Sequence, residues 1–299
     1  MTTNRVDPPL PEAMPRWRTV LGIFKLRIGV LIMLTALAGL AISPAPAPAI
    51  WQIVVMALAV LVASASSGAF NQLIEADGDR AMARTRTRAF ASGALRPGAH
   101  WLGLIVGLLA LAVAAMWIAL NGVAALYLFL GAFTYAVIYT MALKRRTWLN
   151  IVFGGLAGSF AVLTGAAAAD PMLGALPMLL AAVLFLWTPP HFWSLAIANC
   201  DEYAGAGIPM LPVVVGTARA ARIVHANTLA LVAVSLVPVA YGAGPAYLIA
   251  TLAGGGWFLF RTASLARAPT RRTAIAAFFA SMVQLAMLIA GVALDALLR

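Results

Sequence analysis

The sequence has few charged residues and almost no cysteine. Only 10% of its 299 residues are Asp, Glu, Lys or Arg, whereas 63% are hydrophobic and the mean hydropathy is +0.96. A soluble domain is about half apolar and a quarter charged, so this composition excludes one and indicates an integral membrane protein. The single cysteine, Cys200, excludes an internal disulfide and a metal site built from a cysteine cluster.

The sequence also lacks the alternation of apolar and polar residues that builds a membrane β-barrel, so we expect helical spans. A spanning helix needs about 20 predominantly apolar residues. The sequence therefore predicts an all-α integral membrane fold with nine transmembrane helices, at 28–43, 50–70, 99–120, 122–143, 150–169, 171–198, 222–241, 244–260 and 273–297.

Basic residues are nearly absent from one side of this predicted bundle. With a cytoplasmic N-terminus, 19 of the 20 Lys and Arg residues fall on the cytoplasmic side, and only Arg299 falls on the far side with the C-terminus. This asymmetry follows the positive-inside rule and supports the count of spans. Attraction to anionic lipid head groups accounts for the net charge of +11, so the lipid bilayer is the expected partner and no nucleic acid is.

The ends of the predicted bundle differ in composition. Residues 1–16 are polar and proline-rich, which predicts a flexible cytoplasmic tail before a single transmembrane domain at 17–299. The stretch "SPAPAPA" after the first apolar run is similar to a signal-peptidase site. Because a polar leader of 27 residues precedes that run, we expect the first helix to be retained.

The stretch "FNQLIEADGDRAMARTRTRAF" interrupts the apolar sequence with acids and arginines. On a helix, Asn71, Glu75 and Asp79 form one stripe about 12 Å long. Such oxygen ligands favour a hard cation such as Mg²⁺, and the arginines that follow suit phosphate groups. Asp77 faces the other side and is expected to pair with Arg80. A solvated, charged loop between two helices is the alternative interpretation.

Several strings in this sequence resemble a known family. "NQLIEADGDRAMART" is similar to the N-x-x-x-D-x-x-x-D signature of the membrane-embedded aromatic prenyltransferases, the superfamily that includes 4-hydroxybenzoate polyprenyltransferase. The strings "YTMALKRRTWLNIVFGG", "FLWTPPHFWSLAI" and "EYAGAGIPMLPVV" resemble the haem O synthases within it, in the family's order and spacing. This likeness runs from about Lys25 to the last predicted helix.

The resemblance implies both an architecture and a reaction. Nine transmembrane helices would surround a central cavity that opens toward the cytoplasm. Farnesyl diphosphate would transfer its farnesyl group to a vinyl group of haem b, giving haem O and diphosphate, with Mg²⁺ as cofactor. The enzyme would lie in a bacterial inner membrane with its active site facing the cytoplasm, and haem A synthase or terminal oxidase assembly would be possible partners.

The resemblance also assigns roles in the first motif. Asn71, Glu75 and Asp79 would hold Mg²⁺, with Glu75 where the family usually has Asp. Arg84 and Lys144 would act on the diphosphate. Further candidates for substrate contacts are Arg80, Arg88 and Tyr139, whose phenol ring is expected to face the allylic cation.

The second acidic motif is "NCDEYAGAG". The resemblance assigns Glu202 to catalysis and the metal, and Asp201 and Tyr203 to substrate contacts. Adjacent residues diverge on a helix, so Glu202 rather than Asp201 is expected to face the ligand. Pro209 and Pro212 are expected to end any helix and to leave a lid or rim.

Two further features lie in the fifth and sixth predicted spans. His191 in "TPPHFW" is expected to face haem, as an iron ligand or a polar group of the cavity, with Trp193 as a substrate contact; a hydrogen-bonded core histidine is the alternative. The fifth span lacks the usual Pro-Pro pair, and its small residues allow either close helix approach or room for a bulky substrate.

Two other functions remain open at this stage. One is a prenyltransferase of the same fold acting on a quinone or chlorophyll precursor. The other is an ion-coupled membrane transporter, although its ionisable groups would be expected near mid-membrane rather than at one surface.

Overall fold

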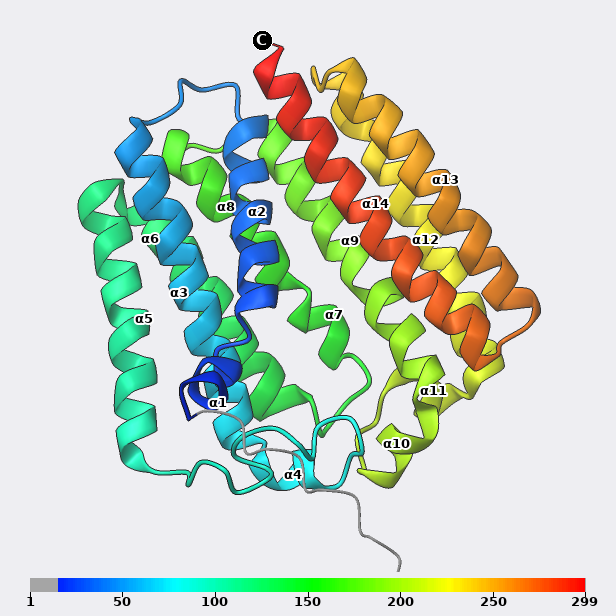
Figure 1. Ribbon diagram of the computed structural model, residues 1–299. Helices are drawn as coiled ribbons and strands as arrows, with labels where there is room; N and C mark the ends of the chain where they lie inside the picture. Colours follow the sequence, from blue (N-terminus) through cyan, green and yellow to red (C-terminus); the bar gives the residue numbers. More distant parts are fainter. Residues whose placement is uncertain (1–15, 299) are drawn as a thin grey trace, which may run out of the picture.

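A computed structural model describes residues 16–298, and every regular element in that part of the chain is a helix. The elements are α1 (Arg16–Ile23), α2 (Leu26–Ile42), α3 (Ile50–Ile74), α4 (Ala76–Arg80), α5 (Ala99–Ala119), α6 (Gly122–Phe133), η1 (Thr134–Leu143), α7 (Asn150–Gly154), α8 (Leu156–Ala169), α9 (Ala175–Ala198), α10 (Cys200–Gly205), α11 (Leu211–Val215), α12 (Thr217–Ala240), α13 (Pro245–Arg267) and α14 (Arg271–Leu297). Figure 1 shows α4, α10 and α11 at one end of the long helices, here called the α4 end, and the C-terminus at the other.

The predicted spans agree with the helices. Among residues 16–298, eight spans are long and apolar enough to cross a membrane, and the pair α1 and α2, bent by 44°, brings the number to nine if it is counted as one span. The seventh and eighth spans are longer than predicted. Helix α12 begins at Thr217 rather than at residue 222, and α13 continues to Arg267 rather than ending at residue 260. Residues 1–15 of the predicted tail lie outside the described part of the chain, and Arg16 already belongs to α1.

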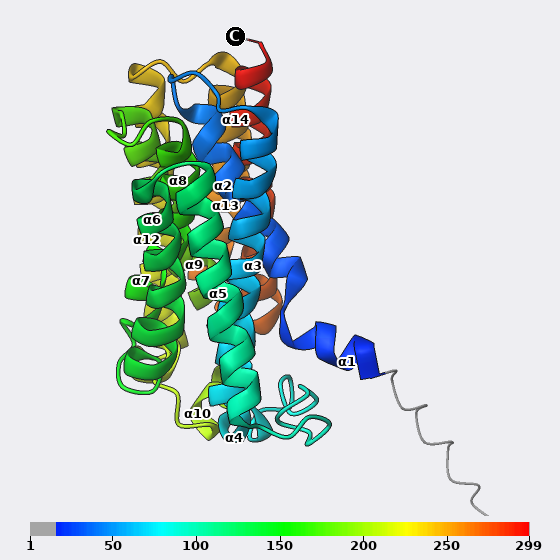
Figure 2. The same ribbon diagram turned by 90° about the vertical axis from the view of Figure 1, so that its left-hand side faces the viewer.

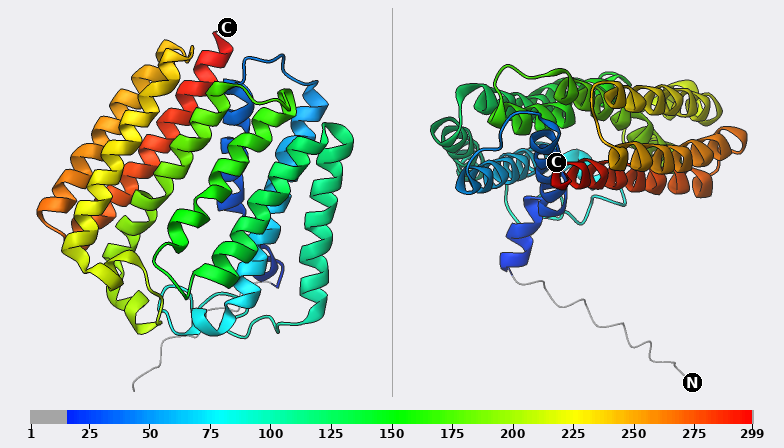
Figure 3. Two further views of the ribbon diagram at one scale, coloured as in Figure 1. Left: turned by 180° about the vertical axis from the view of Figure 1, so that it is seen from behind. Right: turned by 90° about the horizontal axis from the view of Figure 1, so that it is seen from above.

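The long helices enclose an elongated ring when viewed from above, with α1 leaving it sideways (Figures 2 and 3). Helix α2 packs against α3, α8 and α14, and α9 packs against α8, α12 and α14. The buried side chains are mostly apolar, and alanine is frequent among them. Small side chains permit close approach of helices, which is the usual basis of packing where lipid removes the hydrophobic driving force.

Glycines bring α2 and α8 into backbone contact. A Cβ atom at Gly165 would lie 1.7 Å from the carbonyl oxygen of Ala36, and one at Gly39 would lie 2.0 Å from that of Val162. No larger residue fits at either position without separating the helices. The small residues of the fifth span therefore serve close helix approach at this contact.

Two departures from regular α-helix lie near the α4 end. Residues Thr134–Leu143 form a π-helix, in which the N–H of Lys144 donates to the carbonyl of Tyr139, five residues earlier, at 2.9 Å. Helix α9 contains Pro189 and Pro190 and yet runs unbroken from Ala175 to Ala198. The prolines donate no N–H, so they leave carbonyl oxygens of the preceding turn without their usual helical partners.

The segment after α9 corrects one expectation. Pro209 lies between α10 and α11, as a helix-ending residue should. Pro212, however, lies in the first turn of α11 rather than ending a helix. Its missing N–H costs nothing there, because the first N–H groups of a helix have no partner within the helix.

Candidate functional site

Asn71, Glu75 and Asp79 share one face although the helix is interrupted at Glu75. Helix α3 ends at Ile74 and α4 begins at Ala76, and Glu75 between them has φ −95° and ψ 9°. The N–H of Glu75 still donates to the carbonyl of Asn71 at 3.0 Å, and that of Asp79 donates to the carbonyl of Glu75 at 2.8 Å. The i, i+4 register is kept, so all three side chains face the interior and are at most 6% exposed.

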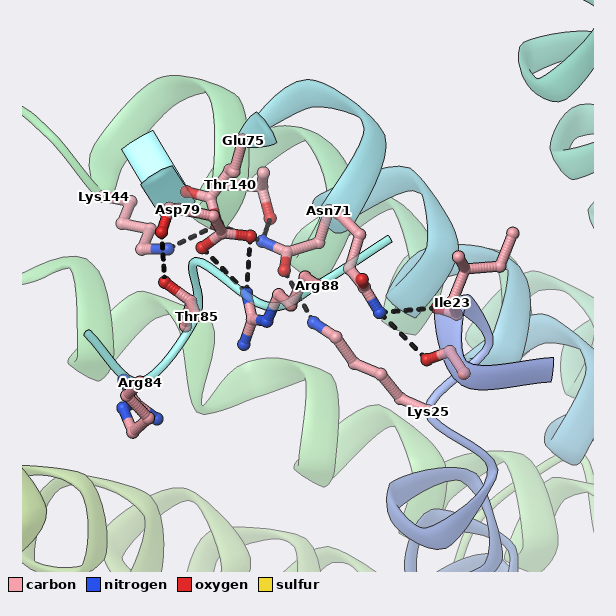
Figure 4. A network of polar contacts seen from close by, with 12 residues as sticks. Ile23, Lys25, Asn71, Glu75, Asp79, Arg84, Thr85, Arg88, Thr140 and Lys144 are labelled. Atoms are coloured by element: carbon pink, nitrogen blue, oxygen red, sulfur yellow. Dashed lines mark hydrogen bonds and ion pairs between the residues drawn. The ribbon is translucent and has the colours of Figure 1, made fainter. Parts of the chain in front are cut away.

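Glu75 is the centre of a polar network (Figure 4). Its Oε2 accepts a hydrogen bond from Asn71 Nδ2 at 2.7 Å and forms an ion pair with Lys144 Nζ. Asn71 Nδ2 also donates to Thr140 Oγ1 at 3.2 Å. The same carboxylate thus joins α3 to η1, and the π-helical turn from Tyr139 to Lys144 carries the ammonium group to it.

Asp79 is held by an arginine from the loop after α4. Arg88 Nη1 donates to both carboxylate oxygens of Asp79, at 2.9 and 2.8 Å. Thr85 Oγ1 donates to the carbonyl oxygen of Asp79 at 2.9 Å, which folds the loop back over the motif. Ion pairs of buried groups need such additional hydrogen bonds to offset their desolvation.

Asp77 and Arg80 form the local pair that the sequence predicts. Arg80 Nη1 lies 2.8 Å from Asp77 Oδ1, and both side chains are exposed. Arg80 Nε also donates to the carbonyl of Ala91 at 2.9 Å, so this arginine links α4 to the loop that follows it. The structure therefore does not bring Arg80 into the network of Glu75 and Asp79.

Arg84 connects the two loops of the α4 end. Its Nη2 donates to the phenol oxygen of Tyr203 at 3.1 Å, across 119 residues of sequence. Tyr203 is buried in α10 against an apolar cluster that includes Met82 of the other loop. Burial raises the pKa of Tyr203 despite the opposing effect of Arg84, so the phenol remains neutral and accepts this bond.

The two acids of α10 differ in environment. Asp201 is exposed, whereas the Oε2 atom of Glu202 is buried with no hydrogen-bond partner in the described part of the chain. The structure thus turns Glu202 rather than Asp201 inward, as the sequence predicts. A buried carboxylate oxygen without a partner is costly, so this oxygen is suited to accept from a donor or a cation.

The oxygen donors fit a magnesium ion. Among residues 16–298, no three His, Cys, Asp or Glu side chains lie close enough together to form a metal site by themselves. Glu75 and Asp79, with the amide of Asn71, offer the one or two carboxylates that Mg²⁺ typically takes from a protein, and water and phosphate complete its shell. Lys144 forms an ion pair with Glu75, and Arg88 forms one with Asp79.

The aromatic candidates lie in α9 and η1. His191 is buried between the rings of Trp187 and Phe278, at centroid distances of 4.3 and 4.6 Å, and its Nδ1 lies 2.7 Å from Ser281 Oγ. Trp193 is 3% exposed, and its Nε1 has no partner in the described part of the chain. Both interpretations of the histidine stay open, because Nδ1 is hydrogen-bonded and Nε2 has no hydrogen bond to residues 16–298.

Tyr139 is fixed by its own neighbours. Its ring stacks on Tyr135 at 5.5 Å, and a Cβ atom at Gly154 would lie 2.9 Å from its Cδ2. Lys144 follows Tyr139 by one π-helical turn, because the N–H of Lys144 donates to the carbonyl of Tyr139.

Sequence reasoning missed two residues that contact Asn71. Lys25 Nζ donates to Asn71 Oδ1 at 2.7 Å, and Thr140 completes the contacts of the same amide. Lys25 is in the sequence only one of several basic residues before the first long apolar run, and Thr140 lies in no acidic motif. Only their positions next to the stripe identify them.

Comparison with known proteins finds one family and relatives that match along most of the chain. The UbiA prenyltransferase family profile matches residues 32–286. Protoheme IX farnesyltransferase 2 of Paramagnetospirillum magneticum is 52% identical over 94% of this chain and 98% of its own length. Protoheme IX farnesyltransferase 1 of Cenarchaeum symbiosum is 38% identical over 93% of this chain and 96% of its own.

Solved structures share the fold. A digeranylgeranylglyceryl phosphate synthase has a TM-score of 0.78 at 16% identity, over 95% of this chain and 99% of its own. A UbiA homologue from Archaeoglobus fulgidus bound to DMAPP and Mg²⁺ has a TM-score of 0.73 at 14% identity, over 90% and 99%. The fold, the match of the family profile and the similarity to these farnesyltransferases agree, and this multi-pass membrane chain is a prenyltransferase enzyme that belongs to the UbiA prenyltransferase family.

Proposed function

We propose that this chain transfers the farnesyl group of farnesyl diphosphate to a vinyl group of haem b, forming haem O. The carbon–oxygen bond of farnesyl diphosphate breaks, and diphosphate leaves with the electron pair. The farnesyl carbon then bonds to the terminal vinyl carbon, and water adds to the adjacent carbon with loss of a proton. Relatives named protoheme IX farnesyltransferase, similar along nearly the whole chain, support this choice of substrates.

The observation that carries the proposal is the buried network at the α4 end. Lys25, Lys144 and Arg88 place three basic side chains next to the two carboxylates of Glu75 and Asp79. The excess of basic groups over acidic ones suits an anionic ligand, and their burial strengthens each electrostatic interaction with charge that develops on a leaving oxygen. Charge-assisted contacts from Lys144, Arg88 and Arg84 would hold the diphosphate in place.

Mg²⁺ would be held by Asn71, Glu75 and Asp79 from one side, with Glu202 from α10 as a further ligand. When bound it neutralises diphosphate oxygens. Lys144 and Arg88, which pair with the two carboxylates in this structure, would contact the phosphates. Tyr203 would hold Arg84 over the site, and Asp201 would remain at its exposed rim.

The acceptor side of the reaction would use the aromatic residues of α9 and η1. Tyr139 lies one π-helical turn before Lys144, where its ring can stabilise the allylic cation. Trp193 and His191 would contact haem, since each has a ring nitrogen without a protein partner among the described contacts. A dry pocket would delay capture of the cation by water.

The proposal includes a location. The α4 end would face the cytoplasm of a bacterial inner membrane, because the predicted excess of Lys and Arg lies there. The single cysteine, in α10 at that end, gives a test: a membrane-impermeant maleimide should label Cys200 in inside-out vesicles and leave it unlabelled in intact spheroplasts. Labelling in spheroplasts would reverse the orientation.

The decisive experiment is mass spectrometry of haems from cells that lack haem O synthesis and express this chain. We expect haem O to accumulate. Asp79→Ala should lower its production about 100-fold or more, because it removes a charge that organises the diphosphate site. Asp77→Ala is the matched control, since this exposed acid two residues away pairs with Arg80 at the surface.

Two results would contradict the proposal. One is the absence of haem O when the chain is present in the membrane, with a prenylated quinone or chlorophyll precursor in its place. The other is normal haem O production by Asp79→Ala at wild-type expression, which would remove the motif from the chemistry. Ion transport is not favoured, because the chain belongs to a prenyltransferase family.

A further inference from the structure

Lys25 lies at the bend between α1 and α2 and reaches into the network. Its Nζ donates to Asn71 Oδ1 at 2.7 Å, and Asn71 in turn donates to Glu75. Figure 4 shows the ammonium group on the side of the network opposite Lys144, next to Arg88. The bend is tied to the motif a second time, because Gln72 Nε2 donates to the carbonyls of Gly22 and Ile23, each at 3.1 Å.

The backbone of Lys25 is in an unusual conformation. Its φ of 48° and ψ of 42° lie in the left-handed region, where a residue with a side chain costs roughly 1–2 kcal/mol. Asn or Gly would be more stable there. The aliphatic part of the side chain packs over Gly68, where a Cβ atom would lie 3.4 Å from the Cβ and Cδ atoms of Lys25 in ordinary van der Waals contact. Strain of this kind persists at positions where a particular side chain is needed for binding or chemistry.

The ammonium group has unused hydrogen-bonding capacity. A lysine carries three N–H donors, and the contact to Asn71 uses one. No carboxylate forms an ion pair with Lys25 in the described part of the chain, unlike Lys144 and Arg88. Arg27, two residues further along, is exposed and makes no contact with the network. A lysine whose contact is an amide oxygen rather than an acid has donors available to an anion.

We propose that Lys25 is a further diphosphate-binding residue, whose ammonium group contacts a phosphate oxygen of the prenyl diphosphate from the side opposite Lys144. This inference rests on the proposed function. It assigns to the α1–α2 bend a contact with substrate that no motif in the sequence indicates. In the structure described here, Asn71 holds the same ammonium group in position.

Binding of farnesyl thiolodiphosphate, a slowly reacting analogue, to the purified protein with Mg²⁺ tests this contact. A lost charge-assisted hydrogen bond should raise the Kd of Lys25→Met about 10- to 100-fold. Lys25→Asn should lose the same affinity although it suits the left-handed backbone, and Lys25→Arg should regain part of it. Arg27→Met, which removes one positive charge nearby, should leave the Kd unchanged.

A double-mutant cycle separates direct contact from an effect through Asn71. If Lys25 only positions Asn71, adding Lys25→Met to Asn71→Ala should cost no further affinity for the analogue or for inorganic diphosphate. We expect the double variant to bind both probes more weakly than Asn71→Ala does. Thermal unfolding of each variant, measured in parallel, shows whether the fold is intact, and Lys25→Asn provides a folded variant if Lys25→Met is unstable.

The outcomes distinguish the two proposals. Wild-type protein that binds the analogue, together with unchanged affinity in Lys25→Asn, would overturn the role of Lys25 alone. A double variant no weaker than Asn71→Ala would reduce Lys25 to a positioning residue and overturn the contact. Failure of the wild type to bind any prenyl diphosphate, or to form haem O, would overturn the proposed function itself.

Discussion

Asp295, near the end of the last helix, caps another helix, and its removal should destabilise the protein. Its two carboxylate oxygens accept hydrogen bonds from the N–H groups of Ala246 and Tyr247, in the first turn of α13, each at 2.9 Å. The N-cap residue of α13 is Gly244, which has no side chain to perform this role. A Cβ at Gly244 would lie 2.5 Å from the carboxyl carbon of Asp295, so glycine makes room for the cap.

The expected loss follows from these contacts. A hydrogen bond to a charged group contributes about 1.5–3 kcal/mol, and a negative charge at a helix N-terminus contributes up to about 2 kcal/mol. These effects overlap, and Asp295 is only 5% exposed, so we expect Asp295→Ala to lower the free energy of unfolding by about 2–4 kcal/mol. Asp295→Asn keeps one acceptor oxygen and should lose about half as much.

Thermal unfolding in detergent measures this effect. For a chain of this size the Tm should fall by roughly 2 °C per kcal/mol, hence by about 4–8 °C for Asp295→Ala. Asp170→Ala is the control, because that carboxylate accepts one exposed local bond from Met172. The affinity for farnesyl thiolodiphosphate should be the same in both variants. Equal Tm values for Asp295→Ala, Asp170→Ala and the wild type would refute the capping role.

Three further predictions concern packing, the first motif and the single thiol. Gly165→Ala should lower the Tm sharply, because its methyl group would overlap a backbone oxygen of α2, whereas Gly158→Ala on the same helix has free space and should be tolerated. Glu75→Asp should retain haem O production, measured by mass spectrometry, and complete loss would contradict its assignment to the family's aspartate position. Burial and the neighbouring Asp201 raise the pKa of Cys200, so maleimide should label it more slowly at pH 7 than it labels a free thiol, and the rate should increase with pH; a rate at pH 7 equal to that of a free thiol would contradict this environment.

The spanning helices were predictable because a bilayer imposes one rule on every span. Each span must be long, apolar and internally hydrogen-bonded, and composition alone reveals such segments. Local irregularities were not predictable in the same way. Nothing in "TYAVIYTMAL" indicates a π-helix. Pro212 was expected to end a helix, but it lies in the first turn of α11. These outcomes depend on which neighbouring groups form hydrogen bonds with the N–H and carbonyl groups of the backbone.

The first acidic stripe was predictable from its spacing, since i, i+4 residues share a helix face wherever the helix is placed. The separation of Asp77 from that stripe and the inward position of Glu202 follow from the same periodicity. The partners of these residues did not follow. Arg88 rather than Arg84 holds Asp79, and Arg84 instead reaches Tyr203, because the loop after α4 folds back over the motif.

The sequence by itself determined that the chain spans the membrane many times and carries a charged motif beside one surface, because hydropathy and helical periodicity are local properties. The tertiary structure alone decided which distant side chains meet. Lys25 joins Asn71 across 46 residues, and Asp295 caps α13 across 48 or more. Such pairs depend on how the helices pack against one another, which the spacing of residues along a single helix does not specify.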